Sequence, residues 1–280
     1  MPSKPFGQPT RGKTAPNRLR KTDTFLAVAY PEFVRHLPGL YVDLGYGAYP
    51  FTSVETLARL RRLNNRLRVL GVEIDPQRVA DAQPFARPGL EFRRGGFNLP
   101  LKSGERAAVV RAFNVLRQYS EADVQAALAA LETALTPNGL LIEGTCSPDG
   151  RLMTFNLYQK SNEGVGAGDL SSLRRTMLVF APSLHSDFLP RQLQAVLPKN
   201  FIHHAEPGGL IDEFFAAWHK SWQRARAQGR DVRQVFYHSA LRLMDHYGYE
   251  VARRPALLKR GFLCLGPTWP QKSSTFTLAK

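Results

Sequence analysis

The chain has 280 residues, a mass of 31.4 kDa and a hydrophobic fraction of 43%. This apolar content is enough for a buried core and excludes disorder throughout the chain. No apolar run reaches the roughly 18 residues that cross a bilayer, and the basic, polar start does not resemble a signal peptide, so we expect a soluble, cytoplasmic protein. Cys146 and Cys264 lack the spacing of a zinc site or a disulfide framework, and no metal site is predicted.

The formal net charge of +15 is concentrated in two parts of the chain. Residues 1–36 contain seven Lys or Arg against two acidic residues, and residues 220–260 contain ten against three. Because phosphate neutralisation supplies most nonspecific affinity for nucleic acids, this asymmetry favours RNA as a partner, bound through the N-terminal arm and residues 220–260. One alternative is a solvated basic surface, and another makes Arg18 and Arg20 lid residues over a small anionic substrate.

The first half of the chain predicts strands that alternate with helices. Residues 1–20 are rich in Pro and Gly and predict an arm without its own core. A broken helix follows over 24–37, interrupted at Pro31. Periodicity then predicts strands at 40–44, 69–74, 90–94, 107–113 and 140–144, helices at 53–63 and 121–135, and a turn at 137–139. Such alternation specifies βαβ units around a parallel sheet.

After residue 144 the alternation ends. The remaining pattern predicts strands at 152–158, 177–180 and 261–265, a Gly-rich link at 163–168, and helices at 189–197, 210–222 and 234–247. The predicted fold class is α/β: a doubly wound, mostly parallel seven-stranded sheet, with its last two strands antiparallel and with C-terminal helical additions. Three segments are expected: a basic arm and broken helix at 1–37, an α/β domain at 38–200, and a helical cap with a closing strand at 201–280.

The predicted core follows from the apolar strand positions. It comprises Val42, Leu44, Val72, Ile74, Val109, Val110, Leu141 and Ile142.

The segment with the clearest chemistry follows the first predicted strand. Asp43, Gly45 and Gly47 stand at the turn, where glycine lets the backbone bend sharply and a ligand lie against it. Glu73 stands at the end of the second predicted strand, on the side of a doubly wound sheet that faces the ligand. A carboxylate there can accept hydrogen bonds from both hydroxyls of a ribose.

With these residues, positions 38–146 resemble the class I S-adenosylmethionine (SAM)-dependent methyltransferases. The glycine turn stands where that family contacts the methionine part of SAM, and Glu73 where its ribose-binding acid sits. Residues 92–101 resemble the motif beside the adenine, 113–116 the end of the fourth strand, and 136–139 the turn before the fifth. The resemblance implies SAM as cofactor, bound by Asp43, Gly45, Tyr46, Gly47, Glu73, Ile74, Gly96, Phe97 and Asn114.

Two positions depart from the family pattern. Tyr49 replaces the usual third glycine, and Gly96 stands where the family commonly has an aspartate that accepts from the adenine amino group. Adenine would then be held by backbone groups, by Asn98, or by stacking on Phe97.

The implied function is methyl transfer from SAM to an unidentified acceptor, either a small molecule or RNA. Methyl transfer from a sulfonium needs little beyond positioning, and Asn114 is the candidate positioning residue. One alternative is a methyltransferase-like RNA-binding protein that has lost turnover. The other, an NAD(P)-dependent oxidoreductase, is disfavoured because position 50 is Pro where the nicotinamide fingerprint has Gly.

Other polar residues leave two interpretations each. Arg111 either neutralises a substrate phosphate or lies on the sheet surface, and Glu143 is either an inward polar residue or a cap. His203 and His204 are adjacent, so they diverge and predict a surface pair rather than a metal site.

Overall fold

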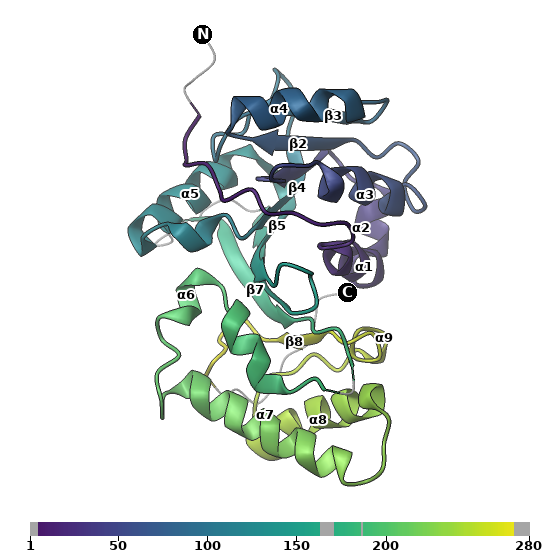
Figure 1. Cartoon of the computed structure of the whole chain (residues 1–280), viewed down its shortest axis with the longest axis vertical. Helices are drawn as coiled ribbons and strands as arrows, with labels where there is room; N and C mark the ends of the chain where they lie inside the picture. The colour runs from purple at the N-terminus through teal and green to yellow at the C-terminus, as the bar shows by residue number, and fades with distance from the viewer. Residues whose placement is uncertain (1–4, 163–170, 186, 272–280) are drawn as a thin grey trace. The chain divides into compact units, whose positions relative to one another are not determined.

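The structure is a computed structural model that describes residues 5–162, 171–185 and 187–271. Its eight strands form one sheet in the order β3-β2-β1-β4-β5-β6-β7-β8 (Figure 1). The chain divides into two compact units. The first contains Met1–Glu143, Pro148–Gly150 and Tyr158–Arg174, and the second contains Gly144–Ser147, Arg151–Leu157 and Arg175–Lys280. The predicted link at 163–168 lies outside the described residues, and the three predicted segments stay a prediction.

The first unit holds the predicted alternation of strands and helices. Pro31 begins a new helix, since its fixed φ suits the first helical position, and this confirms the predicted break. The elements in chain order are α1 (Arg20–Ala29), α2 (Pro31–Arg35), β1 (Leu40–Leu44), α3 (Phe51–Leu60), β2 (Val69–Glu73), α4 (Pro76–Ala82), η1 (Gln83–Phe85), β3 (Leu90–Arg94), β4 (Ala107–Phe113), η2 (Leu116–Gln118), α5 (Glu121–Ala134) and β5 (Leu135–Cys146).

Strands β1 to β4 are parallel, as predicted. β1 pairs with both β2 and β4, and β2 pairs with β3. Asp43 lies opposite Gly71, and Leu44 lies opposite Val72. Asp43 and Glu73 are therefore at the same end of the sheet, where the predicted ligand site requires them.

β5 differs from its prediction at its start. The turn expected at 137–139 lies inside the strand, with Asn138 in the left-handed region at φ 58°. Leu135 and Thr136 are already buried before this point. Burial of these two residues brings the chain into the sheet earlier than the apolar run that begins at Leu140.

Side chains of the strands alternate between two helix-covered faces. On one face Val124, Ala127 and Leu131 of α5 share a buried cluster with Val42 and Val110. On the opposite face lie Tyr41, Asp43 and Arg111, where Arg111 has hydrogen-bond partners in α1 and Asp43 has them in α3. The predicted core is buried except for Ile74, which follows the end of β2 and is half-exposed.

The second unit adds the helices of the C-terminal part. Its elements are η3 (Pro190–Val196), α6 (Lys199–Ile202), α7 (Leu210–Arg226), α8 (Val232–Tyr247), α9 (Pro255–Leu258) and β8 (Leu263–Leu265), while β5, β6 (Met153–Lys160) and β7 (Leu173–Phe180) contribute residues to both units. The helix predicted at 189–197 is a 3₁₀ segment. β7 and β8 are antiparallel, as predicted. The strand number was predicted as seven and is eight, because each apolar run after residue 144 joins the same sheet.

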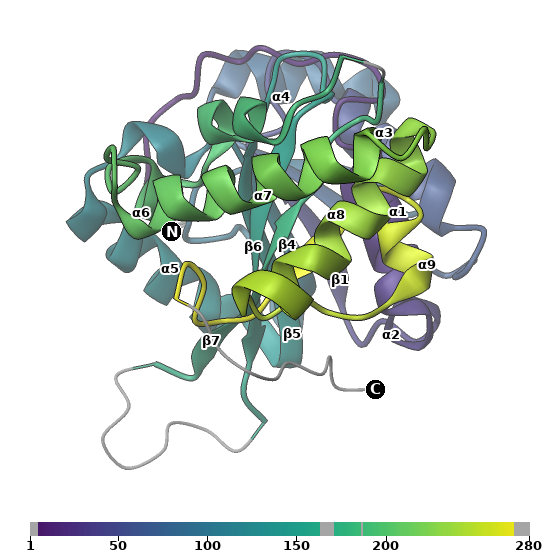
Figure 2. The ribbon, with the colours of Figure 1, turned by 90° about the horizontal axis from the view of Figure 1, so that it is seen from below.

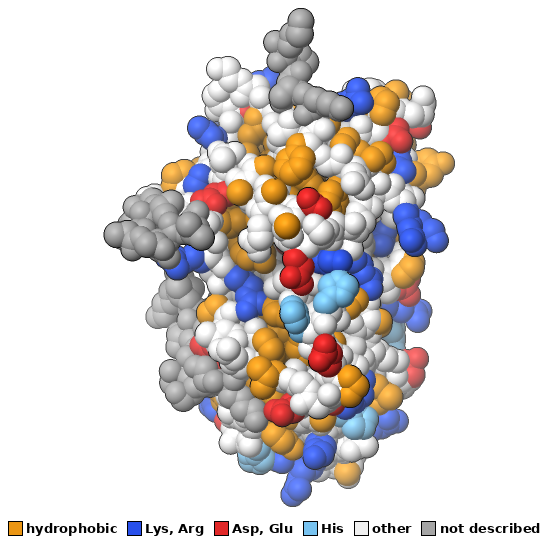
Figure 3. Space-filling view, turned by 90° about the vertical axis from the view of Figure 1, so that its left-hand side faces the viewer, with side chains coloured by type: hydrophobic (Ala, Val, Ile, Leu, Met, Phe, Trp, Pro, Cys, Tyr) orange, Lys and Arg blue, Asp and Glu red, His pale blue; other side chains and the backbone are white. Residues whose placement is uncertain are grey.

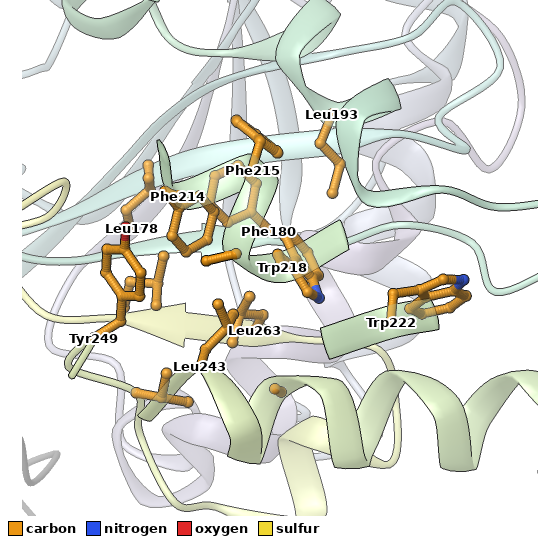
Figure 4. Close-up of a cluster of buried hydrophobic side chains, with 14 of the residues drawn as sticks. Leu178, Phe180, Leu193, Phe214, Phe215, Trp218, Trp222, Leu243, Tyr249 and Leu263 are labelled. Atoms are coloured by element: carbon orange, nitrogen blue, oxygen red, sulfur yellow. The ribbon is translucent and has the colours of Figure 1, made fainter. Parts of the chain in front are cut away.

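Aromatic side chains form the core of the second unit. α7 and α8 lie side by side (Figure 2). Phe214 and Trp218 of α7 pack against Phe180 of β7, with ring centroids 5.6 Å from Phe180 to each (Figure 4). The Trp218 indole donates a hydrogen bond to Ser239 of α8 over 3.2 Å. Trp218 and Trp222 are therefore core residues rather than a platform for a ligand.

Within the described ranges, no helix is long and apolar enough to span a membrane. The same residues bring together no group of three or more His, Cys, Asp or Glu side chains that could hold a metal. His203 and His204 are both exposed, and Cys146 and Cys264 are buried and are not joined in a disulfide.

Candidate functional site

The loop after β1 requires its two glycines. Gly45 and Gly47 have φ values of 72° and 90°, in the left-handed region. A Cβ at Gly45 would lie 2.7 Å from a methyl group of Val115, and one at Gly47 would lie 2.9 Å from the carbonyl oxygen of Gly12. Conformation and space thus both exclude larger side chains from this loop.

Glu73 is buried at the end of β2, with 1% of its surface exposed, and lines a cavity. Its Oε2 accepts a hydrogen bond from the Gly47 amide over 3.1 Å, and its Oε1 accepts one from the Ile74 amide over 2.9 Å. A guanidinium nitrogen of Arg78 lies 3.7 Å from Oε1. The glycine loop, the end of β2 and the first turn of α4 therefore converge on one carboxylate.

Asp43 faces away from this cavity. Its Oδ2 accepts hydrogen bonds from the hydroxyls of Thr52 and Ser53 in α3, at 2.6 and 2.7 Å. Its Oδ1 accepts from Arg111 Nε over 3.0 Å, and Asp43 does not line the cavity. Through these hydrogen bonds the buried Asp43 carboxylate links β1 to α3 and to β4.

Arg111 is fully buried between two carboxylates. One guanidinium nitrogen lies 2.9 Å from Asp43, and another lies 2.9 Å from Asp23 of α1. Burial alone would lower the pKa of Arg111, but the charges of Asp43 and Asp23 outweigh burial and raise it. Arg111 is thus not on an exposed surface of the sheet and not available to a substrate. Both interpretations of this residue from the sequence were wrong.

Three further predicted residues lie beside the cavity without lining it. The Tyr46 hydroxyl donates to the Arg78 carbonyl over 3.2 Å, and burial, together with the charge of Glu73, raises the pKa of Tyr46. Gly47 reaches the site through its bond to Glu73. Asn114 is half-buried directly after β4, with φ at 58°. Glu143, the other polar candidate, is buried within β5.

The cavity has an empty volume of about 270 Å³, which includes the part open to solvent. Five of the predicted cofactor residues line it: Gly45, Glu73, Ile74, Gly96 and Phe97. Apolar side chains of Leu44 and Val115 line it too. Its wall is therefore apolar, with one buried carboxylate.

Most of the remaining wall comes from residues 5–14, a segment that the sequence did not assign to the site and that is here called the docked arm. It runs over the loops that follow β1 and β3 before the chain reaches α1 (Figure 1). The Ala48 amide donates to the Gly12 carbonyl over 2.9 Å, and Arg78 donates to the Thr10 carbonyl over 3.0 Å. The arm is thus anchored to the glycine loop and to α4.

The first residues of the docked arm bind at the loop after β3. The Phe6 carbonyl accepts from the Phe97 amide over 2.8 Å, and the Phe6 amide donates to Asn98 Oδ1 over 2.6 Å. Edge-to-face ring contacts join Phe6 to Phe97 and Phe97 to Tyr119, with centroids 5.4 and 5.3 Å apart. The Gln8 amide donates to the Tyr119 hydroxyl.

Gly96 permits this approach. A Cβ at position 96 would lie 2.0 Å from the carbonyl oxygen of Phe6 and 3.0 Å from its amide nitrogen. Both are backbone atoms, so no side-chain rotation relieves the clash. The sequence carried one sign of this contact. Position 96 is Gly where the resembled family commonly has an acid, and a glycine permits a close backbone approach.

No model of a known protein family matches the chain, and no curated protein matches it. Solved structures similar to it include a SAM-bound amino pentose methyltransferase from Micromonospora echinaspora, involved in calicheamicin biosynthesis, with a TM-score of 0.34 and 16% identity. The match covers 61% of this chain and 69% of that one.

Two others are an N-methyltransferase from Bradyrhizobium japonicum and a SAM-bound magnesium protoporphyrin IX methyltransferase from Synechocystis. The first has a TM-score of 0.31 and 14% identity, and covers 45% of this chain and 66% of its own. The second has a TM-score of 0.33 and 22% identity, and covers 46% of this chain and 59% of its own. This chain therefore spans less than two thirds of the length of either.

Proposed function

We propose that this chain is a SAM-dependent methyltransferase whose acceptor is a small molecule or RNA. The observation that carries the proposal is the placement of Glu73. This carboxylate is buried at the end of β2, touches the glycine loop, and lines the same cavity as Gly96 and Phe97. One site would thus provide a carboxylate for the ribose, a glycine loop for the methionine part, and backbone and ring groups for the adenine.

The site's chemistry fits SAM. Glu73 would accept from the ribose hydroxyls, the loop of Gly45 and Gly47 would contact the methionine part, and the Phe97 amide with Asn98 would bind adenine. SAM supplies an electrophilic methyl group on a sulfonium. The apolar wall made by Leu44, Ile74 and Val115 would exclude water from it.

The chain's own contribution to transfer would be positioning. Asn114, at the end of β4, remains the candidate that orients the acceptor, because its strained left-handed backbone turns the chain at the strand end. A cytoplasmic location also stays a prediction.

The geometry disfavours the oxidoreductase alternative. A dinucleotide places its pyrophosphate on the helix N-terminus after the first strand. In this protein the residue before α3 is Pro50, and the hydroxyls of Thr52 and Ser53 in its first turn donate to Asp43. These polar groups are already committed to an internal carboxylate.

Thermal unfolding with a ligand panel tests the proposal. SAM and S-adenosylhomocysteine at about 100 times the dissociation constant are expected to stabilise the full chain by about 2.7 kcal/mol, a shift of several degrees, whereas NAD and NADP leave the midpoint unchanged. Stabilisation by NAD or NADP and not by SAM would instead establish the oxidoreductase.

A second candidate function, RNA binding, is favoured by a hollow on the second unit. Its empty volume is about 610 Å³, and its lining includes Arg224, Arg230 and Arg242, with His238 beside them. Partial burial and the charge of Arg230 lower the pKa of His238, so the positive charge comes from the arginines. On the face drawn in Figure 3, by contrast, Lys and Arg side chains are scattered among acidic and apolar ones. We propose that the hollow binds RNA phosphates. The exposed Arg11 and Lys13 belong to the first unit and keep the predicted role of the N-terminal arm as a separate contact.

Salt dependence tests this candidate. The logarithm of the affinity for single-stranded RNA should fall with the logarithm of salt concentration by about 0.7 per phosphate contact. The double substitution Arg224→Gln and Arg242→Gln is expected to flatten that slope by about 0.7 per arginine. Arg191→Gln is the control, because Arg191 already pairs with Asp212 at 2.8 Å. Equal slopes in filter binding for all three proteins would eliminate the hollow as an RNA site.

A further inference from the structure

We propose that the docked arm occupies the adenine end of the SAM site, so that SAM binds only after the arm has left it. This inference rests on the proposed function. It assigns residues 5–14 a role beyond a basic tail: they compete with the cofactor for the same hydrogen-bonding groups.

The backbone of Phe6 makes two hydrogen bonds of the kind that an adenine edge would make. Its carbonyl accepts from the Phe97 amide, and its own amide donates to Asn98 Oδ1. Adenine likewise presents a ring nitrogen that accepts beside an amino group that donates. The backbone of Phe6 therefore presents the same acceptor and donor as a purine edge, to the two groups that would read that edge. Phe97 has a single amide hydrogen, so Phe6 and adenine cannot both take it at full strength.

The cavity beside the docked arm is too small for SAM. The cavity left beside the docked arm has an empty volume of about 270 Å³. Much of that volume is open to solvent: the space in which the centre of a water molecule fits is only about 20 Å³, which is room for one or two waters and not for a nucleoside. Phe6, Gly7, Gln8 and Thr10 all line this cavity, so moving the arm is the change that enlarges it.

Gly96 also favours the docked arm over a bound adenine. A side chain at this position would collide with the backbone of Phe6, whereas adenine recognition by itself would be served by an acid there. The glycine thus favours the docked arm at the expense of a direct contact with the adenine amino group. A chain that closes its own site in this way binds cofactor with an affinity reduced by the fraction of molecules whose arm is undocked.

Calorimetric titration of the full-length chain with SAM tests the competition. Phe6→Pro removes the amide that donates to Asn98 and the ring that contacts Phe97, and should tighten SAM binding about tenfold. Phe85→Ala is the matched control, since Phe85 is 41% exposed against 39% for Phe6 and does not line the cavity. It should bind SAM as the natural chain does.

Hydrogen exchange gives a readout independent of affinity. Adding SAM to the natural chain should speed amide exchange in residues 5–14, because the arm is released. Gly96→Ala should speed it without any ligand, because the added Cβ collides with Phe6. An arm that remains protected in Gly96→Ala, or becomes more protected when SAM binds, overturns the inference and makes the arm a lid.

The outcomes separate this inference from the proposed function. Equal SAM affinity in the natural chain, Phe6→Pro and Phe85→Ala overturns the competition and leaves the function standing. Failure of SAM to bind both the natural chain and Phe6→Pro overturns the proposed function, and the inference with it.

Discussion

Replacing Arg111 with methionine is expected to lower the free energy of unfolding of the first unit by about 3–5 kcal/mol. Arg111 is fully buried, and its guanidinium pairs with Asp23 and Asp43, which are 1% and 2% exposed. Without the arginine, two buried carboxylates lose their shared cation. A charge left uncompensated in the interior is far more destabilising than the loss of a surface pair.

The measurement must report on the first unit. All three tryptophans lie in the second unit, so their fluorescence does not follow β1 and β4. Urea unfolding monitored by hydrogen exchange in peptides from β1 and β4 reports on the first unit directly. Arg35→Met is the control, because the exposed pair of Arg35 and Glu32 is worth less than about 1 kcal/mol. Similar losses in both variants would show that the buried network adds nothing.

Replacing Glu73 with glutamine is expected to weaken SAM binding tenfold or more. The carboxylate would accept two charge-assisted hydrogen bonds from the ribose, each worth roughly 1.5–3 kcal/mol, whereas glutamine is uncharged and has one accepting oxygen beside an NH2 group that only donates. The side-chain shape is kept, and the amide oxygen can still accept from the Gly47 amide, although the Ile74 amide then loses its acceptor. Equilibrium dialysis with labelled SAM measures the change.

Asp75→Asn is the matched control for Glu73. Asp75 is the N-cap of α4 and accepts from the amides of Gln77 and Arg78. Asparagine caps helices about as well as aspartate, so this variant should remain folded and bind SAM normally. Loss of binding in Asp75→Asn with normal binding in Glu73→Gln would move the ribose contact to Asp75.

Local sequence patterns predict the strands of the first unit because each is a short apolar run bounded by a turn. β1, β3 and β4 have the predicted bounds, and Gly45 and Gly47 have the conformation that only glycine adopts readily. Glu73 could be placed at the ligand end of the sheet, since parallel strands bring their carboxyl ends together. These features depend on residues close together in the chain.

Long-range contacts could not be predicted in this way. Phe6 binds Asn98, 92 residues away, and Arg111 binds Asp23, 88 residues away. Neither pair leaves a periodic trace in the sequence. Asp43 illustrates the limit: its position after the first strand was correctly recognised, but strand alternation aims its carboxylate at α3 and Arg111 rather than at the cavity.

Ultraviolet cross-linking of methyl-labelled SAM to the full chain, followed by peptide mapping, tests the central claim most directly. The site predicts saturable label in peptides that contain residues 73–78, 95–98 or 115–119, removed by excess S-adenosylhomocysteine and unaffected by NAD. Label confined to the second unit, or label that NAD removes and S-adenosylhomocysteine does not, would contradict a SAM site at the ends of β1, β2 and β3.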